Sequence, residues 1–188
     1  MNRSGIFARF ACAMALALAA GSATSQTAGE PSRPPEPAGE SAAPMSNERL
    51  ESLLRKIDPD VAGQAGFWRL EVGSTDVLVI TDQGADRMRI VAGIAQASLL
   101  DREALYRIAQ ANFDSALDAR YAIARGTLWS AFIHPLSPLD DEQLLSALAQ
   151  VVTLAKTYGT TYSSGALTFG GGDSNELLEE LRDRARAI

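Results

Sequence analysis

The spacing of hydrophobic residues predicts one helix and then three strands between residues 46 and 92. Ser46 or Asn47 can cap the helix, and Pro59 lies just past its end. Apolar and polar residues alternate over 67–72 and 87–92, and a wholly apolar run at 77–80 lies between them. Because only short turns separate these runs, we expect an antiparallel meander. The apolar face of the helix follows the i, i+3, i+4, i+7 spacing at Leu50, Leu53, Leu54 and Ile57.

A second helix and a hairpin are predicted next. The helix begins near residues 99–101 and shows Leu105 and Ile108 on its apolar face. Two strands at 120–124 and 128–134 then face each other across Gly126. Glycine has no Cβ and adopts the positive φ that a tight hairpin turn needs.

The third helix has the strongest local signals. Ser137, Pro138 and Asp140 are typical of a helix start, and Gly159 is typical of a helix end. Between them runs a broad apolar stripe made of Leu144, Leu145, Leu148, Val151, Val152, Ala155 and Tyr158. The order over residues 46–158 is therefore α-β-β-β-α-β-β-α. This order predicts an α+β fold in which helices pack on a five-stranded antiparallel sheet.

The tail at residues 159–188 contains glycines and an additional C-terminal amphipathic helix. Asp173 and Glu176 can form a capping box for this helix. Residues 160–168 fit either a sixth, edge strand or a loop. We expect the last helix to fold back onto the domain or onto a dimer mate, since its apolar face comprises Leu177, Leu178, Leu181, Ala185 and Ile188.

The strand at 128–134 is apolar on both faces. Trp129, Ala131 and Ile133 point one way, and Leu128, Ser130 and Phe132 point the other way. A sheet face that meets water usually carries alternating polar residues. We therefore expect this strand to be covered twice, by helices or by another subunit.

At this point the chain resembles the Tir-chaperone-type (CesT-like) proteins of type III secretion, whose fold the YbjN-like domains share. The resemblance covers residues 46–158. It is carried by the second-helix run up to Ala111-Asn112, the hairpin at Gly126, and the sequence PLSPLD at 135–140. The family implies a non-enzymatic protein, usually a homodimer, that holds a partner chain on exposed apolar surface.

Residues 1–45 differ in composition from the rest of the chain. Arg3 and Arg9 precede and flank an apolar run at 10–20, and small residues follow, which is typical of a signal peptide over 1–25 that is cleaved near Ala23 or Ser25. The run is shorter than the roughly 20 residues needed to span a bilayer, so no stable membrane insertion is expected after cleavage. Residues 26–45 hold five of the eight prolines and read as a disordered linker. We thus expect an exported, periplasmic protein.

Charge and composition exclude several classes of function. The net charge of −6 becomes −8 when residues 1–25 are removed, because they hold two arginines and no acid. An acidic chain lacks the basic field that nucleic acid requires, so no nucleic-acid partner is expected. One His and one Cys cannot build a His/Cys zinc cluster. Cys12 falls within the signal peptide, which leaves the exported chain without a thiol.

The sequence offers weak candidates for chemistry. His134 and Ser130 share a strand face, but no Gly-x-Ser-x-Gly elbow occurs, so no catalytic residue is assigned. The acidic runs at 58–60 and 140–142 lack the ligand spacing of a calcium loop. We therefore expect no enzyme, no metal and no cofactor.

Two functions remain open from the sequence. The first is a homodimeric module that binds a peptide or protein of unknown identity on apolar surface. The second is a periplasmic small-molecule sensor or envelope accessory domain. Aromatic residues are the candidates for partner or dimer contact, with core packing as the alternative for each: Phe67, Trp68, Trp129 and Phe132.

Overall fold

The computed structural model describes residues 43–165 and 175–186. The signal peptide, most of the linker and Asp173 lie outside these residues. Within them, no helix is long and apolar enough to cross a bilayer. The elements are α1 (Asn47–Ile57), β1 (Ala62–Gln64), β2 (Phe67–Val72), β3 (Thr75–Asp82), β4 (Arg87–Gln96), a 3-10 turn (Ala97–Leu99), α2 (Arg102–Asp114), β5 (Arg120–Ala124), β6 (Thr127–His134), α3 (Asp141–Lys156) and α4 (Asn175–Arg186).

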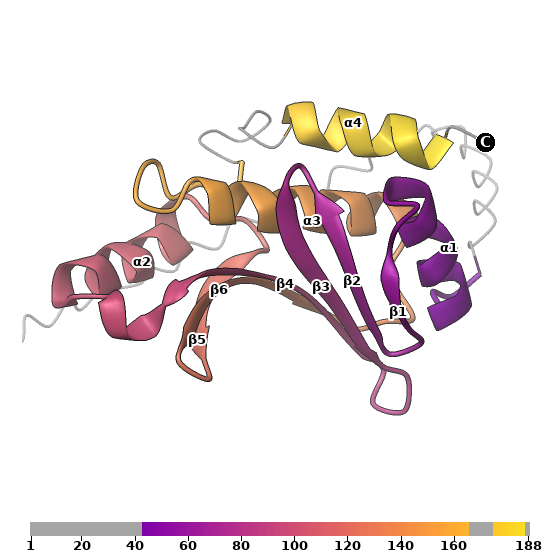
Figure 1. Ribbon diagram of the computed structural model, residues 1–188, viewed down its shortest axis with the longest axis horizontal. Coiled ribbons are helices and arrows are strands. Elements are labelled where there is room, and N and C mark those ends of the chain that lie inside the picture. Colours follow the sequence, from indigo (N-terminus) through magenta and orange to yellow (C-terminus); the bar gives the residue numbers. More distant parts are fainter. Residues whose placement is uncertain (1–42, 166–174, 187–188) are drawn as a thin grey trace, which may run out of the picture. The chain divides into compact units, whose positions relative to one another are not determined.

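One antiparallel sheet forms the centre of the α+β fold, which confirms the predicted class (Figure 1). Its strand order is β1-β2-β3-β4-β6-β5. The sheet has six strands rather than the predicted five, because Ala62–Gln64 pairs with the start of β2. All three residues of β1 are exposed and two of them have no large side chain, so no period-two pattern marks the strand.

Helix α3 covers one face of the sheet. Ten of its sixteen residues are buried, which makes it the most deeply packed helix of the described chain. Asp140 is its N-cap and exchanges hydrogen bonds with Gln143 in a capping box. The predicted start at Ser137 and Pro138 is therefore wrong by a few residues. Ser137 instead donates from its amide and its hydroxyl to the carboxylate of Asp86, at 2.7 and 2.9 Å, and these bonds lower the pKa of Asp86.

The helix-facing side of the sheet carries a continuous apolar row. Trp68 in β2 lies opposite Val79, which lies opposite Ile90, which lies opposite Phe132 in β6. All four side chains are buried, and Trp68 is 0% exposed. Because side chains alternate along a strand, the residues directly before and after each of these four point to the other face of the sheet.

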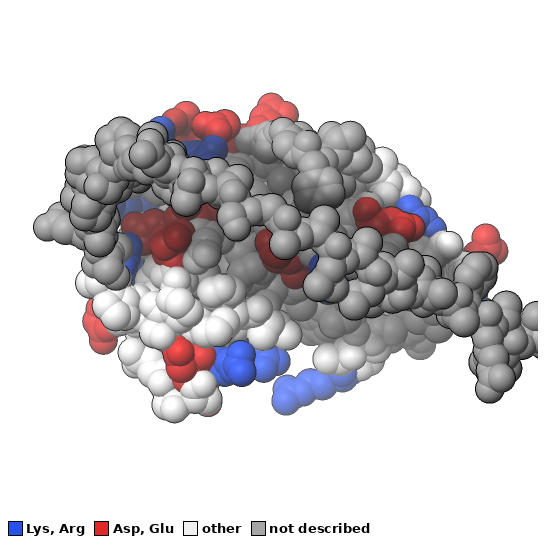
Figure 2. All heavy atoms as spheres, turned by 180° about the vertical axis from the view of Figure 1, so that it is seen from behind, with Lys and Arg blue, Asp and Glu red and all other residues white. Residues whose placement is uncertain are grey.

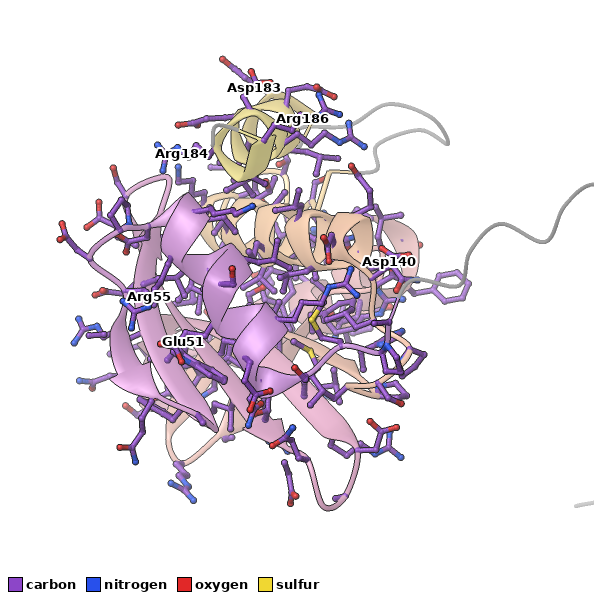
Figure 3. The ribbon with its side chains drawn as sticks, turned by 90° about the vertical axis from the view of Figure 1, so that its right-hand side faces the viewer. Glu51, Arg55, Asp140, Asp183, Arg184 and Arg186 are labelled. Atoms are coloured by element: carbon purple, nitrogen blue, oxygen red, sulfur yellow. The ribbon has the colours of Figure 1, made fainter. Side chains whose placement is uncertain are left out.

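Helix α4 folds back onto α1 and α3, as we expected from its apolar stripe (Figures 1 and 3). Leu181 is 1% exposed. Arg182 binds Glu142 of α3 with two nitrogens, at 2.9–3.2 Å. Arg184 donates to the carbonyl of Ile57 at the end of α1. These contacts fix α4 on the outer side of the helical layer.

Helix α2 lies beside the edge strand β5. The side chain of Asn112 accepts a bond from the amide of Tyr121 and donates one to its carbonyl, at 2.7 and 3.0 Å. Gln150 of α3 accepts from the amides of Asp118 and Ala119 just before the strand. The side-chain amides thus form hydrogen bonds with backbone groups that would otherwise be free at this edge of the sheet.

Leu181→Ala should lower the free energy of unfolding by about 2–4 kcal/mol, because it removes a fully buried side chain between two helices. Urea denaturation followed by circular dichroism measures this change. The matched control is Leu178→Ala on the same helix, where the side chain is only half-buried, and a smaller loss is expected. Equal stability of the wild type and both variants would show that α4 does not pack on the domain.

Candidate functional site

The face of the sheet opposite α3 is uncovered among the described residues. Helices α1, α3 and α4 all lie on one side of the sheet, and no described element lies on the other (Figure 1). We call this second side the open face. Its side chains are largely apolar over four neighbouring strands and comprise Phe67, Leu78, Ile80, Val91, Trp129, Ala131 and Ile133.

This arrangement corrects part of the expectation for β6. α3 covers Leu128, Ser130 and Phe132, which are all buried. The opposite face of the strand has no second layer of helices within residues 43–165 and 175–186. Ile133 is 62% exposed there. Cover by another subunit stays a prediction.

An apolar hollow of about 390 Å³ lies on the open face. Its lining comes from five strands and consists of apolar side chains apart from two arginines, Arg89 and Arg125. Trp129 forms part of its lining, and its indole N–H donates to the carbonyl of Ala124 at 3.1 Å. This bond ties the ring to β5 and limits its freedom to leave the surface.

A larger hollow, of about 770 Å³, continues from the open face at a place that we call the fork. Here β3 and β4 separate, because their pairing ends at Val77 and Ala92 while β4 continues along β6 with a register shift after Gly93. Such an irregularity bends a strand and increases its twist. The ring of Trp129 lies against Gly93, where a Cβ would be in ordinary contact with Cζ3 at 3.6 Å.

The fork combines apolar and polar groups. It shares Phe67, Leu78 and Trp129 with the apolar hollow, and it adds Lys156 and Tyr158 from the end of α3. Loss of hydration, then the neighbouring Tyr162 and Asp101, raise the pKa of Tyr158, so its phenol stays protonated at neutral pH. The two hollows together form one surface that runs from β5 to the end of α3.

The structure separates the four aromatic residues that the sequence suggested for partner contact. Phe67 and Trp129 lie together on the open face and line both hollows. Trp68 and Phe132 point into the core instead. Adjacent residues of a strand face opposite ways, so Phe67 and Trp68 could not both serve one surface. The role of Phe67 and Trp129 in partner binding stays a prediction.

Sequence reasoning missed the aliphatic part of the open face and its two arginines. Leu78 and Ile80 sit in a wholly apolar strand, where the pattern does not tell one face from the other. The alternation of apolar and polar residues does place Arg89 on the side of β4 away from the core, but it does not show that Arg89 lines a hollow. The position of Arg125 beside the hollow depends on the turn geometry, in which Arg125 and Gly126 have φ of 51° and 75°.

A separate polar hollow of about 410 Å³ contains His134. Its ring stacks on Phe132 at 5.7 Å, and Nδ1 lies 2.7 Å from the carbonyl of Pro135, so this nitrogen carries the proton. Ser130 is buried on the core side and does not line this hollow. No group of three or more metal-binding side chains occurs in the described part of the chain.

Helix α2 exposes an apolar stripe on its outer side. Tyr106 and Phe113 are 67% and 90% exposed and lie seven residues apart, which places them on the same side of the helix. Ala109 lies between them and is also exposed. These residues belong to α2 and not to the strands of the open face, so the described residues carry a second apolar surface.

Comparisons with known proteins give a limited result. No protein-family model matches the chain, and no curated protein matches it. One similar solved structure is described as the crystal structure of the ExsC-ExsE complex. It shares 14% sequence identity and a TM-score of 0.45, over 60% of this chain and 92% of that chain.

The two tryptophans should report the difference between the faces. A Trp68→Phe variant leaves Trp129 as its single tryptophan, and a Trp129→Phe variant leaves Trp68. Acrylamide should quench the emission of Trp129 several times more efficiently than that of Trp68, because only Trp129 is reached from solvent. Equal quenching in the two folded variants would show that the open face is covered.

Proposed function

We propose that this chain is a non-enzymatic, chaperone-like module that binds a peptide or protein segment on its open face. The observation that carries the proposal is the continuous apolar surface over four strands without cover from the described residues. Contiguous exposed apolar surface is typical of interaction sites. The sequence resemblance to type III secretion chaperones supports the same kind of function.

The edges of the sheet favour binding to the face rather than addition of a strand. At β5, Asn112 holds both backbone groups of Tyr121, and a new strand would have to break these bonds. At the other edge, β1 has only three residues. A partner that adds a strand needs a row of free backbone groups. We therefore infer that side chains of the open face carry the recognition.

Trp129 is the proposed central anchor. It lines both hollows and is held by its bond to Ala124. A large, partly immobilised aromatic side chain loses little conformational entropy on binding, and such residues dominate many interfaces. Phe67 and Ile133 flank it as exposed apolar contacts.

We also propose that the module acts after export and as a homodimer. The sequence pattern of residues 1–25 supports export, and removal of Cys12 with that segment leaves a thiol-free chain suited to an oxidising compartment. The outer stripe of α2 supports the dimer, since Phe113 is almost fully exposed. A second copy would cover this stripe without blocking the open face.

A small-molecule sensor is the alternative. The fork, at about 770 Å³, is within the usual volume range of ligand pockets. A native mass spectrum of the purified chain distinguishes the two functions. A bound compound of a few hundred daltons that survives purification would favour the sensor over the protein-binding module.

Ile133→Asp should weaken binding of an unfolded client by about tenfold, because a charge replaces an exposed apolar contact of the surface. Reduced, carboxymethylated α-lactalbumin serves as the client, and isothermal titration calorimetry measures the affinity. The matched control is Ile123→Asp, an isoleucine of similar exposure on the opposite face of β5. If both variants bind the client as the wild type does, the open face is not the binding surface.

Phe113→Glu should convert the dimer to a monomer, because it places a charge in the proposed α2 interface. Light scattering coupled to size-exclusion chromatography measures the mass, with twice 20.0 kDa expected for a wild-type dimer of the full chain. Client affinity per chain should stay unchanged. A wild-type chain of monomer mass would contradict the dimer and leave the open-face proposal standing.

A further inference from the structure

Two arginines line a hollow that is otherwise apolar. Arg89 lies between Ile80 and Ile133 in the cross-strand register, and Arg125 forms part of the turn that joins β5 to β6. Neither side chain is paired with a carboxylate of the described residues. Both charges therefore face the space that a partner would occupy.

Several other arginines of the described chain pair with carboxylates, although the salt bridges among the described residues do not include Arg87, Arg102, Arg107, Arg120 or Arg186. Arg49, Arg55, Arg182 and Arg184 each lie within 2.6–2.9 Å of a carboxylate on the helical side of the molecule. On the open face, Arg69 is bonded to both oxygens of Asp76 at 2.9 Å, so these two charges cancel. Arg89 and Arg125 are left as a positive charge on one side of an acidic protein.

The charged side chains on the surface can be compared with this pattern of ion pairs. Figure 2 shows several acidic side chains along the upper edge, where α4 lies, and two groups of basic side chains at the lower edge, with acidic side chains beside one of them. Glu71 is an acidic residue of the open face, and it lies at the β2–β3 end, opposite Asp76. The positive potential is thus concentrated over β4, β5 and β6.

We propose that the open face recognises an acidic amphipathic segment, in which apolar side chains fill the hollow and carboxylates meet Arg89 and Arg125. This inference rests on the proposed protein-binding function and specifies its partner. The two arginines lie near opposite ends of β6: Arg89 pairs with Ile133, and Arg125 lies in the turn just before Thr127, the first residue of the strand. The separation of these ends along β6 is about 20 Å at 3.3 Å per residue, so an extended partner would place its carboxylates about six residues apart.

Charge complementarity of this kind has a measurable signature. Attraction between partly exposed charges is screened by salt, with a Debye length of about 10 Å at 0.1 M. Apolar contact does not weaken in the same way, and high salt tends to strengthen it. The acidic part of the recognition should therefore disappear as salt rises while the apolar part remains.

The experiment uses three labelled peptides with the same apolar residues and two charged positions six residues apart. These positions hold Glu, Gln or Lys. Fluorescence anisotropy with the full chain should show that the Glu peptide binds about tenfold more tightly than the Gln peptide in 50 mM NaCl, and that the Lys peptide binds most weakly. The preference for Glu should fall below about twofold in 500 mM NaCl.

Variants assign the effect to the two arginines. Arg89→Gln with Arg125→Gln should remove the preference, so that the variant binds the Glu peptide and the Gln peptide with equal affinity. The matched control, Arg55→Gln with Arg186→Gln, removes the same charge from α1 and α4 and should keep the preference. Thermal melts confirm that all variants fold, which is expected because the four side chains are exposed.

The outcomes separate this inference from the proposed function. Equal affinity for the three peptides, with loss of binding in Ile133→Asp, would overturn the acidic preference and retain the protein-binding face. Absence of binding by all three peptides, together with unchanged client binding by Ile133→Asp, would overturn both. Binding to vesicles of anionic lipid that the Glu peptide does not displace would assign the arginines to a membrane surface and overturn the inference.

Discussion

The packing of α3 against one face of the sheet is the interaction on which the other features depend. Ten residues of this helix are buried, and the helix packs on β4 and β6, whose buried side chains include Ile90 and Leu128. Strict alternation along each strand then sends the intervening residues to the far side. One-sided cover therefore creates both the stable core and the open apolar face. A second layer of helices would have removed the candidate site.

The same helical layer also controls the edges of the sheet. Gln150 of α3 and Asn112 of α2 bind backbone groups at or next to β5, so the edge is closed by side chains rather than by another strand. Proteins commonly protect edge strands, because the free backbone groups of an edge can pair with strands of other chains. Here the closure directs contact to the face, where Trp129 and Phe67 are available. The geometry of the edge thus supports the assignment of the site to the face.

Local irregularity gives the face its shape. The register shift beside Gly93 separates β4 from β3 and opens the fork. The ring of Trp129 lies beside the backbone of Gly93 in β4. The half-buried Trp129, held by its bond to Ala124, can act as an anchor, while the arginines at the ends of the hollow add charge selectivity. The shape of the face comes from an irregular strand pairing, its anchor is Trp129, and its positive charge comes from Arg89 and Arg125.

Apolar residues that repeat at strand or helix spacing predicted the fold class, five of the six strands and all four helices. It did not reveal β1, whose Ala-Gly-Gln lacks a period, or the true start of α3 at Asp141, since several adjacent residues could cap it. Local pattern showed that β6 is apolar on both faces. Only the tertiary structure decided which face α3 covers, and so which of Trp68 and Phe67 meets solvent. That choice depends on contacts between residues far apart in the chain, which no local spacing records.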